Sequence, residues 1–456
     1  MKKNYVFLAG LVLFAVLISQ TAFSNTILPG EKQGLTGFDY LVKGAEREVE
    51  LATAMTTGDF NGDGVMDIAV GSTRAGSPRG IEEAGAVSVF FGGTNFNALP
   101  ATLEAIADEK EDVLLYGGSA QEYAGEFLAS GDLNGDGIDD LVIAAQQIKD
   151  TGAPVDAKEA KIYIVYGGAS LSGNISLASK ADVVIQRKDS MHAEDIVIAD
   201  FNGDATDDIL ITDILTDDVK HPPVAPRIEG EPRGVNGAVY LILGGGLNQT
   251  VNPTEDAKST IMRNTGEDVF QVYSMAAGDF NNDGQTDIAL GAPGEDCTSP
   301  ELSETGKVYL ILDAQNLNGD VDIETLADVV ITGALENDQI GGKLAACDFN
   351  NDGVDDVIIG APLSGWGEAG TTGKGKVQVV FGAATLNPAM DLYEDNSVDL
   401  QLSSDSARIG FKTGMEILGT DINGDGVDDL VISSPNAFTK AGTNGWVHVV
   451  FGSSSP

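Results

Sequence analysis

The stretch Asp421-Ile-Asn-Gly-Asp-Gly-Val-Asp-Asp429 decides the fold. Oxygen-bearing side chains stand at its first, third, fifth and ninth positions, and Gly426 stands at the sixth, where a sharp turn favours a residue without Cβ. In a tight loop these oxygens converge on one point, and the backbone carbonyl of the seventh residue, Val427, can join them. An irregular shell made only of oxygens suits Ca2+ better than Mg2+, so the stretch predicts a calcium loop.

The loop occurs six times, and every copy has Asp, Asn, Asp and Asp at positions one, three, five and nine. Ordinary turns need Gly or Asn at only one or two places, so they do not explain four fixed oxygen donors in every copy. The third copy departs because Ala205 replaces the glycine at position six, and we expect that site to be strained or weaker. The copies are Asp59–Asp67, Asp132–Asp140, Asp200–Asp208, Asp279–Asp287, Asp348–Asp356 and Asp421–Asp429.

The residues that follow each loop indicate its kind. An EF-hand needs Glu at position twelve and a helix on either side. Here position twelve is apolar, and it lies in a short run rich in β-branched residues, which is typical of a buried strand. Each loop therefore joins two strands. The residues at position twelve are Val70, Ile143, Ile211, Leu290, Ile359 and Ile432.

The loops recur about every 70 residues, and each interval contains the same order of strand signals. In the fifth unit, Gly342–Ala346 leads into the loop, Val357–Gly360 leaves it, Lys376–Phe381 follows a glycine-rich turn and Val398–Leu402 closes the unit. Four short antiparallel strands repeated around a ring form a β-propeller. We expect an all-β fold of six four-stranded blades, with seven blades as the alternative.

The ends of the chain predict how the ring closes. The sixth unit supplies a third strand, Trp446–Phe451, and then the sequence stops one strand short of a full blade. Phe38–Val42, which precedes the first unit, resembles a fourth strand. We expect the N-terminal and C-terminal strands to pair, because this pairing would leave no open sheet edge.

The first residues predict export. Lys2 and Lys3 precede an apolar run from Tyr5 to Ile18, and Ala22–Ser24 offers small residues to a signal peptidase. The run is short for a spanning helix, and no later segment is apolar enough to cross a bilayer. We expect residues 1–24 to be a signal peptide and residues 25–456 to form the propeller in an extracytoplasmic compartment, whether secreted, periplasmic or on the cell surface.

Composition limits the partners and the chemistry. The formal net charge of −44 argues against nucleic acid and against anionic membrane surfaces. The sequence contains three histidines, which lie in different units, and it lacks a Gly-x-Ser-x-Gly elbow, a phosphate-binding loop or a zinc-binding spacing. We therefore predict that the chain is not an enzyme.

The units resemble FG-GAP repeats, the propeller repeats of the integrin α-subunit head and of many exported bacterial proteins. Gly291–Pro293 and Gly360–Pro362 match the Gly-Ala-Pro of the family, and closing strands such as Val379–Gly382 match it as well. The resemblance implies that structural Ca2+, up to six ions, lies in the loop between strands one and two of each blade. It also implies that partners bind on the opposite face.

The resemblance assigns the ligands position by position, with side chains at positions one, three, five and nine and the carbonyl oxygen at position seven. The predicted ligands are Asp59, Asn61, Asp63, Val65 and Asp67; Asp132, Asn134, Asp136, Ile138 and Asp140; Asp200, Asn202, Asp204, Thr206 and Asp208; Asp279, Asn281, Asp283, Gln285 and Asp287; Asp348, Asn350, Asp352, Val354 and Asp356; and Asp421, Asn423, Asp425, Val427 and Asp429.

Two functions are compatible with these residues. The first is a calcium-stabilised module for structure or cell adhesion that binds a protein or glycan through the calcium-free face. The proline-rich segment Asp213–Gly237 is a candidate contact loop there. The second is a hydrolase or lyase of polysaccharide or phospholipid, which would need a cluster of further carboxylates, His or Arg at the central channel. We favour the binding module, because the sequence gives no sign of such a cluster.

Overall fold

A computed structural model provides the structure. It describes residues 41–44, 51–92, 102–105, 111–145, 160–186, 193–213, 237–263, 270–298, 301–364, 375–392, 399–403, 412–434, 438–439, 442–443 and 446–453. The predicted signal peptide and residues 214–236 of the candidate contact loop lie outside these residues.

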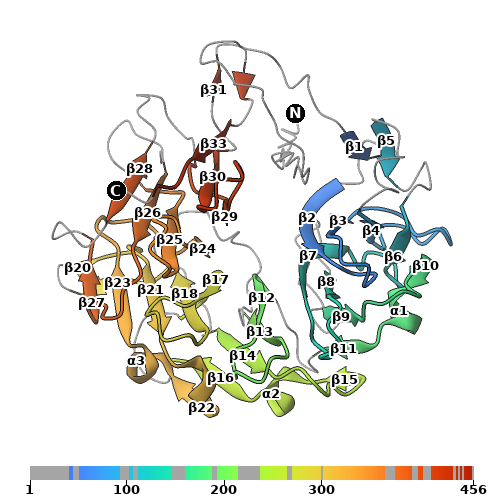
Figure 1. Ribbon diagram of the computed structural model, residues 1–456, viewed down its shortest axis with the longest axis horizontal. Coiled ribbons are helices and arrows are strands. Elements are labelled where there is room, and N and C mark those ends of the chain that lie inside the picture. Colours follow the sequence, from blue (N-terminus) through green and yellow to red (C-terminus); the bar gives the residue numbers. More distant parts are fainter. Residues whose placement is uncertain are drawn as a thin grey trace, which may run out of the picture.

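The described residues form six larger β-sheets arranged as blades around a central opening (Figure 1). Within each blade, strands that follow one another are antiparallel and run from the centre outward. The prediction of an all-β propeller with six blades is thus confirmed. No helix in the described part of the chain is long and apolar enough to cross a membrane.

Each blade contributes its first strand to the centre, and consecutive first strands contact one another from blade one to blade six. The first strands are β2 (Leu51–Gly58), β7 (Ala124–Gly131), β12 (Ile196–Ala199), β17 (Ser274–Gly278), β24 (Lys343–Cys347) and β29 (Ile417–Thr420). The second strands are β3 (Asp67–Ser72), β8 (Asp140–Ala145), β13 (Asp208–Asp213), β18 (Asp287–Ala292), β25 (Asp356–Ala361) and β30 (Asp429–Ser434).

The third and fourth strands complete the blades toward the outside. The third strands are β4 (Ala86–Phe90), β9 (Lys161–Val165), β14 (Ala238–Ile242), β21 (Lys307–Ile311), β26 (Lys376–Val380) and β33 (Trp446–Val450). The fourth strands are β6 (Val113–Tyr116), β11 (Val183–Ile185), β16 (Ser259–Met262), β23 (Val329–Thr332) and β28 (Leu400–Ser403).

The apolar runs form strands because both faces of a blade are covered by its neighbours. In β13, β18 and β25 every residue is buried, so continuous apolar runs replace the alternation of a half-exposed strand. The core lies between blades: Phe201 and Leu210 of blade three pack in one cluster with Ile288 and Leu290 of blade four. Each blade therefore depends on the next one for its stability.

A fifth strand extends four of the blades, and the sequence did not predict it. It belongs to the connection between strands three and four of the following blade and pairs in parallel with the fourth strand of the preceding one. Its segments are short and partly polar, so they lack the apolar signal of the inner strands. They are β10 (Gly173–Ser176), β15 (Thr250–Val251), β22 (Gly319–Asp322) and β27 (Ala389–Asp391).

The predicted pairing of the chain ends needs a correction. The N-terminal strand β1 (Leu41–Gly44) pairs in parallel with β5 (Thr102–Ala105), and β33 pairs only with β30 among the described strands. At four other junctions, a segment from the connection between strands three and four of one blade pairs in parallel with the fourth strand of the preceding blade. The strand β5 lies in that connection of blade one, and β1 is its parallel partner. The N-terminal strand thus takes a fourth-strand position through β5 instead of through β33.

The junction between blades three and four contains a buried ionic cluster. The Arg263 guanidinium follows β16 and donates to Glu295 Oε2 at 2.9 Å and to the Tyr309 hydroxyl at 2.6 Å, both in blade four. Lys307 Nζ lies 3.0 Å from the same carboxylate, and Glu324 also accepts from Arg263. The Glu295 side chain is fully buried, so its negative charge depends on these partners.

We expect Arg263→Met to destabilise the protein by about 3 kcal/mol, because removing one partner leaves a buried charge poorly compensated. The measurement is thermal and urea unfolding of residues 25–456. Arg79→Met, at an exposed arginine, is the matched control and should change stability by less than about 0.5 kcal/mol. Equal stability of the two variants would contradict a stabilising role for the cluster.

Candidate functional site

The first residue of each acidic loop organises the turn through its side chain. In the sixth loop, Asp421 Oδ1 accepts the backbone N–H groups of Gly424 at 2.7 Å and Asp425 at 3.1 Å, and its Oδ2 accepts that of Gly426 at 2.8 Å. The corresponding aspartates make the same kind of contacts in the other five loops. Position one therefore folds the loop around a carboxylate.

The ninth residue anchors the loop to its blade. Asp140 Oδ2 accepts the N–H of Leu133 at 3.0 Å, and its Oδ1 accepts that of Gly167, just after the third strand, at 2.9 Å. All six ninth-position aspartates are fully buried. The loop conformation is thus tied to the sheet by a buried carboxylate.

The structure brings the third, fifth and ninth side chains together. The amide of Asn134 donates to Asp140 Oδ1 at 3.3 Å, and the amide of Asn281 donates to Asp283 Oδ2 at 3.1 Å. Three predicted ligand oxygens are buried without a hydrogen-bond partner, namely Asn281 Oδ1, Asn350 Oδ1 and Asp287 Oδ1. Buried acceptors of this kind normally have a partner, and a hard cation bonded to them would provide one.

Burial raises the pKa of ninth-position carboxyls, to about 6 for Asp67 and Asp208 and to about 7 for Asp140, Asp287 and Asp356. Backbone N–H donors oppose the rise, and the fifth-position carboxylate of the same loop adds to it. The negative charges of one loop therefore destabilise one another, and a divalent cation would offset this repulsion.

The donor types of the loops suit Ca2+, which takes carboxylate, amide and carbonyl oxygens. In the part of the chain that the structure describes, no three His, Cys, Asp or Glu side chains form a group that could hold a metal ion, and this includes the three aspartates of each predicted shell. Each predicted shell also uses the amide oxygen at position three and the carbonyl oxygen at position seven. The binding of Ca2+ by these thirty residues stays a prediction.

The sixth position adopts a left-handed backbone conformation in every loop. The φ angle is +81° to +87° at Gly64, Gly284, Gly353 and Gly426, and it is +65° at Ala205. A residue with a Cβ is strained there, so the expected strain of the third loop is confirmed for its backbone.

A second candidate site is a layer of polar side chains at the start of the first strands. In blades three to six, one residue of the first strand pairs with position twelve of the loop, and the residue just before it is polar. These polar residues are Asp195, Ser274, Lys343 and Glu416. They therefore occupy equivalent places in blades three to six. We call these four residues the channel layer. The layer lies at the opposite end of the first strands from the acidic loops.

Contacts link the channel layer from blade to blade. Ser274 Oγ donates to Asp195 Oδ2 at 3.1 Å, and the N–H of Leu344 donates to Ser274 Oγ at 3.0 Å. Lys343 Nζ lies 3.2 Å from Glu416 Oε2, with 29% of the lysine and 54% of the glutamate side chain exposed. The layer therefore combines a partly exposed lysine side chain with carboxylates.

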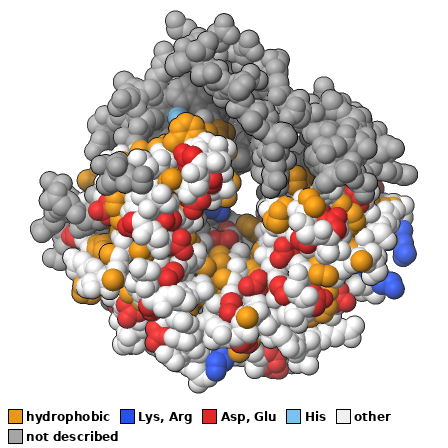
Figure 2. Space-filling view, viewed as in Figure 1, with side chains coloured by type: hydrophobic (Ala, Val, Ile, Leu, Met, Phe, Trp, Pro, Cys, Tyr) orange, Lys and Arg blue, Asp and Glu red, His pale blue; other side chains and the backbone are white. Residues whose placement is uncertain are grey.

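Electrostatics maintain the charge of this lysine. Burial alone would lower the pKa of Lys343, but the carboxylates of Glu416 and Asp195 raise it above its ordinary value. Burial raises the pKa of Asp195, although Lys343 and hydrogen bonds oppose the rise. On the face seen in Figure 2, Asp and Glu are spread over the blades, whereas Lys or Arg appears at few places, one of them at the wall of the central opening.

The sequence contains a signal for this layer in its spacing from the loops. Each of the four residues stands five places before the first aspartate of its loop, and Ala54 and Phe127 are their equivalents in blades one and two. The four polar residues therefore share one position of the repeat. The prediction that the sequence offers no charged cluster at the channel was wrong for this reason.

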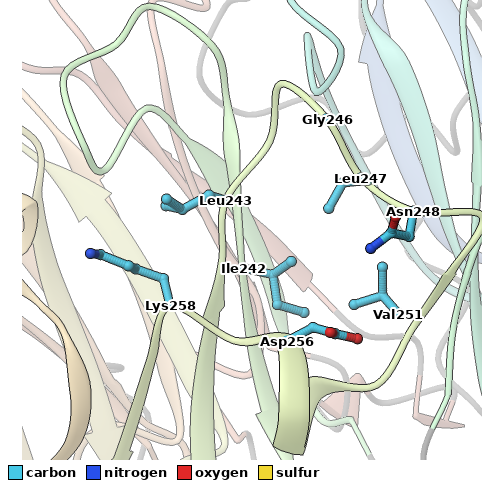
Figure 3. A pocket seen from close by; sticks show the side chains of 8 residues that line it. All are labelled: Ile242, Leu243, Gly246, Leu247, Asn248, Val251, Asp256 and Lys258. Carbon is cyan, nitrogen blue, oxygen red and sulfur yellow. The ribbon is translucent and has the colours of Figure 1, made fainter.

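A pocket of about 280 Å³ lies in the connection between strands three and four of blade three (Figure 3). Ile242, Leu247 and Val251 form its apolar wall. Its two charged residues already serve the fold, because Asp256 accepts the N–H of Asn252 and Lys258 donates to Asn318. We therefore do not assign it a ligand.

The family model of the FG-GAP repeat matches residues 51–90, 124–154, 272–311, 341–380 and 413–450. The chain is an FG-GAP repeat protein of the integrin-alpha-like kind. The third loop, with Ala205, is the one acidic loop outside the matched residues.

The chain is similar to curated proteins over part of its length. It is 32% identical to mouse phosphatidylinositol-glycan-specific phospholipase D over 165 residues, which are 36% of this chain and 18% of that protein. It is 25% identical to integrin alpha-5 of Xenopus laevis over 187 residues, or 40% of this chain and 15% of that one. The chain thus spans less than a fifth of the length of these relatives.

Among solved structures, exotype rhamnogalacturonan lyase YesX has a TM-score of 0.36 and 11% identity, covering 72% of this chain and 47% of that one. This likeness is too low to bear on function. The prediction that the chain is not an enzyme is nevertheless overturned, because relatives from mammals and from Dictyostelium discoideum that align with it are named as a phospholipase D.

We expect Ala205→Gly to stabilise the protein by about 1 kcal/mol, because glycine adopts a positive φ without strain. The reverse change Gly137→Ala, at a position with φ +82° and no atom within 4 Å of the added Cβ, should destabilise it by a similar amount. Urea unfolding in the presence of chelator measures both changes. Two shifts of the same sign would contradict this account of the third loop.

Proposed function

We propose that the chain is an exported hydrolase that acts on phosphatidylinositol-glycan lipids and is built on a calcium-stabilised propeller. The observation that supports it most is the similarity of its repeats to phosphatidylinositol-glycan-specific phospholipase D of several species. The aligned part is 18% of the mouse protein, so the activity itself is our proposal.

The channel layer supplies groups suited to this chemistry. A phospholipase D hydrolyses a phosphodiester, whose non-bridging oxygens carry negative charge. The ammonium group of Lys343 can bind those oxygens and stabilise the charge that develops during attack by water. Glu416, which pairs with the lysine, and Asp195, whose charge also acts on it, are candidates for taking or giving the proton.

A release assay tests the hydrolase. Vesicles of phosphatidylcholine carrying a reporter on a glycosylphosphatidylinositol anchor are incubated with residues 25–456 and calcium, and the released reporter is counted. We expect release, and we expect Lys343→Met to reduce it at least about tenfold, in line with losing one charge-stabilising group. Lys180→Met, at an exposed lysine of helix α1 (Leu177–Lys180), is the control and should keep full activity.

Release no faster than in buffer would contradict the hydrolase. Equal loss in both lysine variants would contradict the role of the channel layer. A chain that binds the vesicles but releases nothing would instead favour a second candidate, a module that binds a protein or glycan through the calcium-free face. The similarity to integrin alpha chains favours that candidate.

The calcium part of the proposal rests on the loops. The buried, unpartnered oxygens of Asn281, Asn350 and Asp287 support it, as does the mutual repulsion of carboxylates within a loop. Ca2+ would stabilise the blades by binding only the folded loops. Its role would be structural, at the end of the propeller opposite the channel layer.

We expect excess chelator to lower the melting temperature strongly, because folding and metal binding are coupled. Native mass spectrometry of the mature chain in calcium should count up to six ions, one for each loop. Magnesium is the control and should protect less, since it needs a regular octahedral shell. A melting temperature that chelator leaves unchanged, with no bound ion, would contradict the calcium sites.

A further inference from the structure

The eighth position of the loop carries an aspartate in four of the six copies, and this residue is not among the predicted ligands. Each of these aspartates accepts the backbone N–H of the first residue of the loop in the preceding blade. The bonds are Asp59 N to Asp139 Oδ2 at 2.7 Å, Asp132 N to Asp207 Oδ2 at 2.9 Å, Asp279 N to Asp355 Oδ2 at 2.9 Å and Asp348 N to Asp428 Oδ2 at 3.3 Å.

Backbone bonds reinforce three of these four contacts in the opposite direction. The N–H of Asp139 donates to the carbonyl oxygen of Asp59 at 3.2 Å. The same reciprocal bond joins Asp207 to Asp132 at 3.0 Å and Asp355 to Asp279 at 3.1 Å. We call the aspartate with its bond to the preceding loop an inter-loop clamp.

A glycine before the first loop residue makes room for the clamp. A Cβ added to Gly58, Gly131 or Gly278 would lie 3.0, 2.5 or 2.9 Å from the carboxylate oxygen of the clamping aspartate. Cys347 occupies this place in blade five, and the clamp there has the longest bond, 3.3 Å. The glycine and the aspartate are thus two halves of one contact.

Two junctions lack both halves. At the junction of blades three and four, Ala199 precedes the loop and Thr286 stands at the eighth position of the next one. At the junction of blades six and one, the residues are Thr420 and Met66. The clamps therefore join loops one, two and three in one group and loops four, five and six in another.

We propose that the inter-loop clamps couple calcium binding between adjacent loops, so that the six sites act as two groups of three. This inference rests on the proposed calcium sites. The clamp fixes the backbone of a residue whose carboxylate is a predicted ligand, so ordering one loop positions the first ligand of the loop before it. Its negative charge would also offset the repulsion between cations held in the two loops that it joins.

Calcium titration of the mature chain, followed by calorimetry and native mass spectrometry, tests the coupling. Asp139→Ala removes no predicted ligand, yet two of the six ions, those of loops one and two, should bind about tenfold more weakly, as expected for a lost hydrogen bond to a charged group. Asp139→Asn keeps an acceptor oxygen and should restore most of the affinity. Thr286→Asp combined with Ala199→Gly should raise the affinity of loops three and four.

The control is Asp182→Ala, which removes an equal charge and a 2.8 Å bond from the N–H of Tyr166 within a single blade. It should leave all six affinities unchanged. Melting in chelator verifies that each variant is folded. Six unchanged affinities in Asp139→Ala, or a weakening in Asp182→Ala as large as in Asp139→Ala, would overturn the coupling alone. A wild-type chain that binds no calcium would overturn the calcium sites as well.

Discussion

The buried carboxylate at the ninth position of the loop is the contact on which the architecture depends. One of its oxygens binds the start of the loop, as at Asp429 with Ile422. In every loop except the fourth, the other oxygen binds the backbone just after the third strand, as at Asp429 with Gly452. A single side chain thus fixes the loop, the beginning of the second strand and the spacing of three strands. Hydrogen bonds to a charged group contribute about 1.5–3 kcal/mol, so this residue offsets much of the cost of its own burial.

The contacts between adjacent blades differ around the ring, because two successive junctions with an inter-loop clamp are followed each time by one junction without it. Where the inter-loop clamp exists, the contact lies on the loop face. Where it is missing, between blades three and four, the buried Arg263–Glu295 pair and the bond from Met275 N–H to Asp195 at 2.8 Å join the blades instead. The exposed apolar side chains of Met66, Leu418 and Phe451 all belong to blades one and six. At the junction of blades six and one, which lacks the clamp, the N-terminal strand β1 pairs with β5 of blade one.

The sequence predicted the features that the same residues mark in every unit, and it missed those that depend on contacts between units. Loops such as Asp348–Asp356 and the inner strands could be predicted because the same residue types recur in every unit. The parallel fifth strand, for example β22, was missed because its pairing partner belongs to another blade and no local pattern encodes it. Arg263 and Glu295 were missed for the same reason, since only the closed arrangement of blades brings them together.

In a repeat protein, a position whose residue type differs between units is one where the fold does not require a particular residue. The place five residues before each loop holds Ala54, Phe127, Asp195, Ser274, Lys343 and Glu416 in turn, so the propeller accepts apolar, polar and charged side chains there. The first strands are partly buried, and packing alone does not call for a charged side chain at their start, because a charge close to the core must be compensated. Four consecutive polar residues that satisfy one another across blades are therefore better explained by a task at the channel than by stability.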